Sequence, residues 1–340
     1  MTAKTKNLAR ISPYFRRLCS HRLLKSVKIL TQTSILSPVR SKSDRLLGQL
    51  GSGQLEKLLK AHARSFALTL SFLPPVIREP LSLGYLLARA SDTVADAAGI
   101  PRERRLELLE ELQGLLESEL FCWKPRIGHG ELSSSELELV EALPMLMVTL
   151  ERHRDRGEIL LLWKSILKGQ SFDLQRFTPR APALSGEELE EYCFLVAGSV
   201  GETWTRLIAN YASRTLLRPP AEMEKLGISY GKGLQLLNIL RDRSEDLKLG
   251  RHYISEVSVP EMMMLAESWL NQGAQYCSNL RPGRLRYASN LPLRLAFATL
   301  NRMHRSQESS KVKIPRWEVY GILIKTLPSL VLPSRRNPAS

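Results

Sequence analysis

From about Leu46 onward, apolar residues recur at steps of three and four positions, and the alternating runs typical of β-strands are rare. This period places the apolar side chains on one face of successive helices, so the pattern predicts an all-α protein. Prolines and capping residues mark the helix ends, as in the capping box that Ser185 forms with Glu188. The expected helices cover roughly 52–72, 80–98, 101–119, 133–153, 156–171, 185–213, 219–246, 260–280, 290–306 and 315–326.

Length and charge divide the chain into two parts. The 340 residues, 43% of them hydrophobic, are enough for one helical domain around a large apolar interior, which we expect at 44–340. Residues 1–43 carry ten Lys or Arg and no acid, which leaves +5 of the net charge of +15 for the rest. This segment resembles a transit peptide in composition; a flexible basic arm and an upstream start codon explain it equally well. Because the basic excess is confined to it, we expect no nucleic-acid partner.

Cysteine usage and hydropathy limit the compartment. The four cysteines are scattered without a CxxC pair, which disfavours a zinc site or a disulfide framework and fits a reducing compartment. No run of 18 apolar residues exists, so we expect no membrane-spanning helix. We expect a monomer in the cytoplasm or peripheral on the inner membrane face, or in an organelle if 1–43 is a transit peptide.

Two pairs of aspartates carry the candidate chemistry. Asp92 with Asp96, and Asp242 with Asp246, are each four residues apart, so each pair points to one side of its helix. The like charges repel each other unless a hard cation lies between them, and Mg²⁺ binds one or two carboxylates together with phosphate oxygens. A single pair is explained as well by an ordinary solvated helix face. Both pairs, however, follow strongly apolar helical segments, which favours a metal site.

The residues around the pairs indicate what the metal would serve. Gln235 and Asn238 precede the second pair, and Arg241 and Arg251 lie beside it, while Arg89 precedes the first pair. Carboxylates, amide carbonyls and guanidinium groups together suit a metal-bridged phosphate. Ordinary salt bridges to the nearby acids are the alternative for the arginines.

Four ordered motifs extend the comparison to a known family. They are His62-Ala-Arg-Ser-Phe66, the segment 85–96, the segment 192–201, and the segment 234–246 followed by Gly250-Arg-His-Tyr253. In this order, over roughly 55–310, the chain resembles the squalene/phytoene synthases, head-to-head prenyltransferases of the all-helical isoprenoid synthase fold. The amino-acid sequence of the segment 85–96 resembles squalene synthases more than phytoene synthases.

This resemblance implies roles for particular residues. The residues expected to bind Mg²⁺ are Asp92, Asp96, Asn238, Asp242 and Asp246. Those expected to act in the reaction are Tyr85, Tyr192, Tyr253, Asp92 and Asp242. Those expected to contact the prenyl diphosphates are Arg64, Ser65, Phe66, Arg89, Val196, Ala197, Gly201, Gln235, Asn238, Arg241 and Arg251. For the small residues around Gly201, close helix packing is an equally good explanation, and Tyr192 has the alternative of an ordinary core tyrosine.

The resemblance implies Mg²⁺-dependent condensation of two farnesyl diphosphates through presqualene diphosphate to squalene, with NADPH as reductant. A phytoene or dehydrosqualene synthase, which loses a proton and needs no reductant, is the alternative. A non-enzymatic assembly subunit is the second alternative, and a head-to-tail synthase is disfavoured because the DDxxD motif is missing. The chain departs from the family pattern at Ala95, where many relatives carry an acid, and at Arg243, where an aliphatic residue is usual.

Overall fold

A computed structural model describes residues 52–118, 123, 127, 130–177, 181–305 and 314–332. The chain divides into two units, Met1–Gly48 and Gln49–Ser340, and every described residue belongs to the second unit. The basic segment 1–43 therefore lies outside the described residues. Its role and the expected domain boundary at residue 44 stay predictions.

The described residues form helices and contain no β-strand, which confirms the all-α prediction. None of these helices is long and apolar enough to cross a bilayer. The α-helices are α3 (Ser52–His62), α4 (Arg64–Ser71), α5 (Pro75–Asp96), α6 (Arg102–Ser118), α7 (Ser134–Glu141), α8 (Leu143–Glu151), α9 (Arg156–Arg176), α10 (Gly186–Cys193), α11 (Ser199–Ala212), α12 (Pro220–Lys248), α13 (Val259–Ser278), α14 (Arg284–Arg305) and α15 (Arg316–Thr326).

Helix boundaries differ from the expected ones mainly at prolines. The helix expected from residue 80 already begins at Pro75, because a proline in the first turn needs no hydrogen-bond donor, and it continues through Pro80. The helix expected over 133–153 is two helices, α7 and α8, which meet at Ala142, two residues before Pro144. Likewise, α3 and α4 are separated at Ala63. The capping box at Ser185 is confirmed, since its side chain accepts the Glu188 amide.

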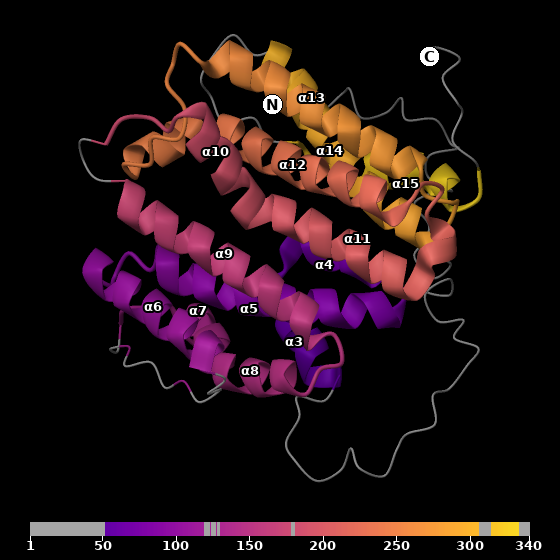
Figure 1. Ribbon diagram of the computed structural model, residues 1–340. Helices are drawn as coiled ribbons and strands as arrows, with labels where there is room; N and C mark the ends of the chain where they lie inside the picture. Colours follow the sequence, from indigo (N-terminus) through magenta and orange to yellow (C-terminus); the bar gives the residue numbers. More distant parts are fainter. Residues whose placement is uncertain are drawn as a thin grey trace, which may run out of the picture. The chain divides into compact units, whose positions relative to one another are not determined.

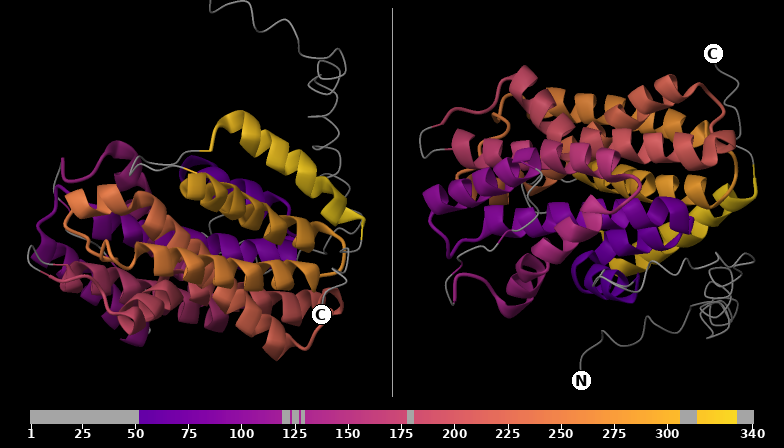
Figure 2. Two further views of the ribbon diagram at one scale, coloured as in Figure 1. Left: turned by 90° about the horizontal axis from the view of Figure 1, so that it is seen from above. Right: turned by 60° about the horizontal axis from the view of Figure 1, so that its bottom comes forward.

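The helices pack in two groups that enclose an apolar interior. In Figure 1, α5, α6 and α9 lie in the lower part of the bundle, and α10 to α13 lie in the upper part. α5 packs against α9, and α12 packs against both α11 and α13. The two views of Figure 2 show the same long helices running side by side. The acidic C-terminal ends of α5 and α12 lie at the same end of the bundle, where the chain after α12 contacts Asp96.

The segment between α10 and α11 is a π-helix, Phe194–Gly198 (η2), which the sequence pattern did not predict. The wider turn of a π-helix interrupts the regular hydrogen-bond ladder and is frequently found at functional sites. Here the hydroxyl groups of Ser165 and Ser199 both donate to the Leu195 carbonyl, at 3.1 and 2.8 Å. The π-helix lies directly after Tyr192 and packs against α12 and α9.

Candidate active site

The first acidic pair lies at the C-terminal end of α5. This helix turns Leu86, Leu87 and Val94 into the core, which leaves the opposite face for Asp92 and Asp96. Asp92 is half-buried and forms an ion pair with Arg89, one turn earlier. Asp96 is exposed. The apolar segment before the first pair is therefore part of a largely buried helix, and the carboxylates occupy its accessible face.

The second pair lies at the C-terminal end of α12, where Asp242 and Asp246 are both half-buried. Arg241 Nε donates to Asp242 Oδ1 at 3.0 Å. After α12 the chain reverses at Gly250, whose φ of +77° lies in the left-handed region that favours glycine. The turn places Arg251, whose backbone N–H donates to the Asp246 carbonyl at 2.8 Å, beside the first pair.

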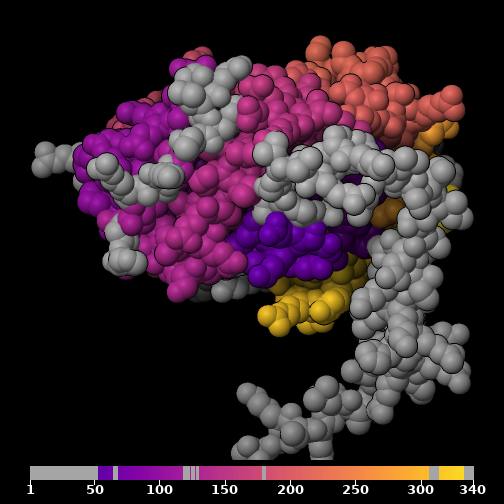
Figure 3. All heavy atoms as spheres, turned by 90° about the horizontal axis from the view of Figure 1, so that it is seen from below, coloured from indigo at the N-terminus to yellow at the C-terminus, as the bar shows by residue number. Residues whose placement is uncertain are grey.

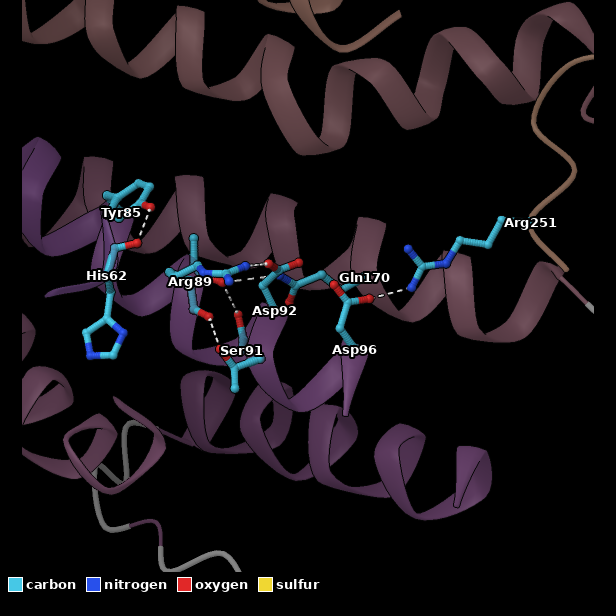
Figure 4. A network of polar contacts seen from close by, with 10 residues as sticks. His62, Tyr85, Arg89, Ser91, Asp92, Asp96, Gln170 and Arg251 are labelled. Carbon is cyan, nitrogen blue, oxygen red and sulfur yellow. Dashed lines mark hydrogen bonds and ion pairs between the residues drawn. The ribbon is translucent and has the colours of Figure 1, made fainter. Parts of the chain in front are cut away.

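Arg251 joins the two pairs. Its guanidinium group forms an ion pair with Asp96, 155 positions earlier in the sequence. Figure 4 shows Arg89, Asp92, Asp96 and Arg251 in a row along α5, with Arg251 reaching in from the loop after α12. The structure therefore brings the two DxxxD motifs to one place, with Arg89, Arg241 and Arg251 around them.

Burial, together with repulsion between neighbouring carboxylates, raises the pKa of two aspartates in the cluster. Burial and the charge of Asp96 raise the pKa of Asp92 above its usual range, although Arg89 opposes the shift. Burial likewise raises the pKa of Asp246 to about 6, with Arg251 opposing and Asp242 adding to the rise. The charge of Asp96, on α5, adds to the rise at Asp246, on α12, because the two helix ends lie close together. A bound cation would relieve this repulsion.

The donor set fits Mg²⁺ held jointly by protein and substrate. Among the described residues, no group of three or more His, Cys, Asp or Glu side chains is close enough to hold a metal alone. Mg²⁺ seldom uses an all-protein cage and is usually bound by one or two carboxylates plus substrate phosphates. Two carboxylate pairs with arginines between them meet that requirement.

A second cluster of polar groups lies close to the π-helix. The hydroxyl groups of Tyr192 and Tyr253 both donate to Oδ2 of Asp173, each at 2.8 Å, and the two hydroxyl oxygens are 3.2 Å apart. The two tyrosine rings are tilted against each other, with centroids 5.2 Å apart, and both side chains are buried. The structure thus joins two of the three tyrosines expected in the reaction centre. Tyr85 is used differently: its hydroxyl donates to the His62 carbonyl at 3.2 Å.

Asp173, near the end of α9, was missed by the sequence analysis. Burial raises its pKa to about 7, and the hydrogen bond from Tyr253 opposes this rise. Its other oxygen, Oδ1, is shielded from solvent and has no hydrogen-bond partner among the described residues. The only sequence signal was a lone acid between Phe172 and Leu174, in a stretch where a solvated carboxylate is not expected.

We expect replacement of Asp173 by Asn to change how stability depends on pH. The folded carboxyl holds its proton up to about pH 7, whereas the unfolded one loses it near its ordinary value of 3.8. The free energy of unfolding of the wild type therefore falls as pH rises between these two values. Asn still accepts hydrogen bonds from both tyrosine hydroxyls but does not ionise, so the variant lacks this pH-dependent loss of stability. Urea denaturation should show the variant gaining about 2 kcal/mol on wild type between about pH 5 and pH 8. A difference that is independent of pH would contradict the assignment.

Five further expected site residues lie on α4 and α12. The side chains of Arg64, Ser65 and Phe66 lie outside the described part of the structure, so their roles stay predictions. On α12, Gln235 is half-buried and Asn238 is exposed, within two turns of Asp242. The two departures from the family pattern have local explanations. Ala95 belongs to the apolar core, and Arg243 lies 4.0 Å from the carboxylate of Glu256 in the following loop.

An apolar cavity of about 150 Å³ lies between α11, α12 and α14. Ala197, Val200 and Gly201 line it from one side, and Gly231 and Leu234 from the other. Val196, also expected to contact substrate, packs instead against Gly169.

The small residues have a second role in helix packing. A methyl group on Gly201 would lie 2.0 Å from the Gly227 carbonyl oxygen, and one on Gly231 would lie 2.1 Å from the Ala197 carbonyl oxygen. Both explanations of the small residues around Gly201, close helix packing and an apolar lining for substrate, therefore apply.

Comparisons with known proteins show to which family the chain is similar. The family model for squalene/phytoene synthase matches residues 59–258. A squalene synthase (LSS) of Botryococcus braunii is 29% identical over 222 residues, which cover 64% of this chain and 44% of that protein. The squalene synthase of Bos taurus is 25% identical over 294 residues, 79% of this chain and 68% of that protein.

Solved structures agree in fold. The structure of TcSQS with the ligand BPH1237 aligns with a TM-score of 0.66 at 23% identity and covers 80% of this chain and 85% of that one. A dehydrosqualene synthase in complex with a ligand aligns with a TM-score of 0.57 at 20% identity, covering 81% and 94%. The fold is therefore the all-α isoprenoid synthase fold.

The chain belongs to the squalene/phytoene synthase family. Among its relatives the squalene synthases prevail. The chain spans less than half the length of several of these curated relatives, 44% for the squalene synthases of Botryococcus braunii and Candida albicans.

Proposed function

We propose that this protein condenses two farnesyl diphosphates head to head, through presqualene diphosphate, to squalene. One observation carries the proposal: the carboxylate pairs of α5 and α12 meet at one end of the bundle and are joined by Arg251. Such a cluster suits two diphosphate groups with bound cations far better than it suits a neutral ligand.

The protein's own residues would act mainly by binding and by excluding water. Arg89, Arg241 and Arg251, which pair with the acids in the structure, would turn part of their hydrogen bonding to diphosphate oxygens. Asp92, Asp96, Asp242 and Asp246 would hold Mg²⁺, with Asn238 in support. When bound, Mg²⁺ supplies positive charge that stabilises a departing diphosphate.

The apolar cavity would take a prenyl chain. Its lining is almost entirely apolar, so it would keep a carbocation on a bound prenyl chain from water. Tyr192 and Tyr253 direct their protons to Asp173, which leaves oxygen lone pairs of both phenols available to stabilise positive charge nearby. The same arrangement suits the alternative ending, in which a proton is lost and no reductant is needed.

Product analysis distinguishes the two possible last steps of the reaction, reduction by NADPH and loss of a proton. The full chain is incubated with Mg²⁺ and either farnesyl or geranylgeranyl diphosphate, with and without NADPH, and the products are identified by mass spectrometry. We expect squalene from farnesyl diphosphate with NADPH, and presqualene diphosphate without it. Turnover of geranylgeranyl diphosphate alone would contradict the proposal and favour a phytoene synthase, whereas dehydrosqualene formed without NADPH would favour a dehydrosqualene synthase.

The surroundings of the enzyme follow from the same chemistry. We propose that the protein is a monomer and that it lies in the cytoplasm or on the inner membrane face. Contact with the membrane would suit prenyl substrates and products, because these partition into lipid. An organelle is expected instead if residues 1–43 are a transit peptide, which fractionation of cells that express the full chain and a chain lacking 1–43 would show.

A further inference from the structure

Helix α15 is apolar on both of its faces. Ile322 and Thr326 are buried against the rest of the domain. Trp317, Tyr320 and Ile324 lie on the opposite side, and 72%, 64% and 52% of their surface is exposed. Residues three, four and seven apart share one face of a helix, so these three side chains form a continuous stripe. An ordinary surface helix carries polar residues there, and a large exposed apolar stripe marks an interaction site.

The exposed apolar surface continues beyond the helix. Val331 and Leu332, which follow the short 3₁₀ turn after α15, are also strongly exposed. In Figure 2, left, α15 (yellow) lies at the margin of the bundle, and its packing partner is α14. Figure 3 shows C-terminal residues (yellow) at the molecular surface beside the N-terminal helices (indigo). We refer to Trp317, Tyr320, Ile324, Val331 and Leu332 as the α15 stripe.

Basic side chains border the stripe. A groove of about 1030 Å³ between α14 and α15 is lined by Trp317 and by five charged residues, Arg294, Arg302, Arg305, Lys325 and Glu318. Glu318 forms an ion pair with Arg302, so Arg294, Arg305 and Lys325 leave a net positive charge. All three of these side chains are exposed. Aromatic and aliphatic residues next to Lys and Arg form the pattern that binds the interface of an anionic bilayer.

We propose that the α15 stripe docks this protein on the surface of an anionic lipid bilayer, with Trp317 at the headgroup level and the basic residues of the groove against lipid phosphates. Charge favours an anionic bilayer over two other possible binding partners of the stripe, a second copy of the chain and residues 1–43. A second copy of the chain would bring the same basic groove to the contact, and residues 1–43 carry ten basic side chains and no acid, so both would be repelled. An anionic bilayer offers the apolar interior and the negative charge together.

Vesicle binding tests this proposal with the full chain. Sedimentation with phosphatidylcholine vesicles is compared with sedimentation with vesicles that also contain phosphatidylglycerol. We expect binding to the anionic vesicles, weakened by salt. Trp317→Ser with Ile324→Ser should reduce the partition coefficient at least about 10-fold, and Arg294→Glu with Lys325→Glu by a similar factor. The matched controls, Leu161→Ser with Met264→Ser and Arg152→Glu with Lys225→Glu, change equally exposed side chains elsewhere and should bind as wild type does.

Three outcomes would overturn the proposal. They are no binding of wild type to anionic vesicles, an equal loss in the control variants, or a wild-type dimer that becomes a monomer on Trp317→Ser with Ile324→Ser. Circular dichroism verifies that the variants are folded. Turnover of prenyl diphosphate in detergent micelles should be the same in stripe variants and wild type, so a failed activity proposal and a failed docking proposal give different results.

Discussion

Replacing Asp92 or Asp242 with Asn should reduce the turnover of prenyl diphosphate by about 10²–10³-fold. Asn keeps the shape of the side chain but removes the negative charge that would hold Mg²⁺ beside the leaving diphosphate. Because the two residues come from different helices, α5 and α12, equal losses would show that both pairs serve one centre. The measurement is the rate of diphosphate release from farnesyl diphosphate at saturating Mg²⁺.

The controls for this prediction lie on the same helices. Glu79→Gln on α5 and Glu222→Gln on α12 each remove one exposed negative charge far from the cluster, and both should retain wild-type turnover. If Asp92→Asn and Asp242→Asn also retained it, the carboxylates would not be metal ligands. If the gene's biological role were equally untouched by both substitutions, the assembly-subunit alternative would become the better one.

Substituting Gly201 or Gly231 with Ala should destabilise the fold by about 3 kcal/mol or more. The added methyl group would lie 2.0 Å from the Gly227 carbonyl oxygen in the first case, and 2.1 Å from the Ala197 carbonyl oxygen in the second. Both obstacles are backbone atoms, which cannot rotate away, so α11 or the π-helix must separate from α12. Chemical denaturation would measure the loss.

Gly114→Ala on α6 provides the matched control. Apart from its own stretch of helix, no atom of the described residues lies within 4 Å of the position that its methyl group would take. The substitution should therefore stabilise the protein by about 0.5–1 kcal/mol, as expected for Ala in place of Gly inside a helix. If Gly201→Ala were as stable as wild type, α11 and α12 would not be packed as closely at Gly201 as they are in the structure.

The sequence revealed the parts of the site that depend on local spacing. Two acids four residues apart must share a helix face, so the pairs at Asp92 and Asp242 were recognisable before the fold was known. The capping box at Ser185 is local for the same reason, and the family motifs singled out Tyr192, which the structure places beside Tyr253 and Asp173. These features need no knowledge of what lies across the bundle.

What the sequence did not reveal depends on contacts between distant segments. Asp173 has no acidic neighbour at helical spacing, and its meaning appears only when α9 brings it against Tyr192 and Tyr253. Arg251 was expected beside the second pair, but its ion pair with Asp96 requires the reversal at Gly250. The π-helix likewise packs against both α9 and α12, and these contacts between distant segments are not visible in the sequence pattern.

A crystal structure with Mn²⁺ in place of Mg²⁺ and an unreactive thio-analogue of farnesyl diphosphate would show whether the two carboxylate pairs form one metal and diphosphate site. Anomalous scattering locates the metal independently of the protein density. We expect Mn²⁺ between the analogue's diphosphate and carboxylates from both α5 and α12, with Arg251 turned from Asp96 toward the diphosphate. Diphosphate bound elsewhere, or metal held by only one of the two pairs, would contradict it.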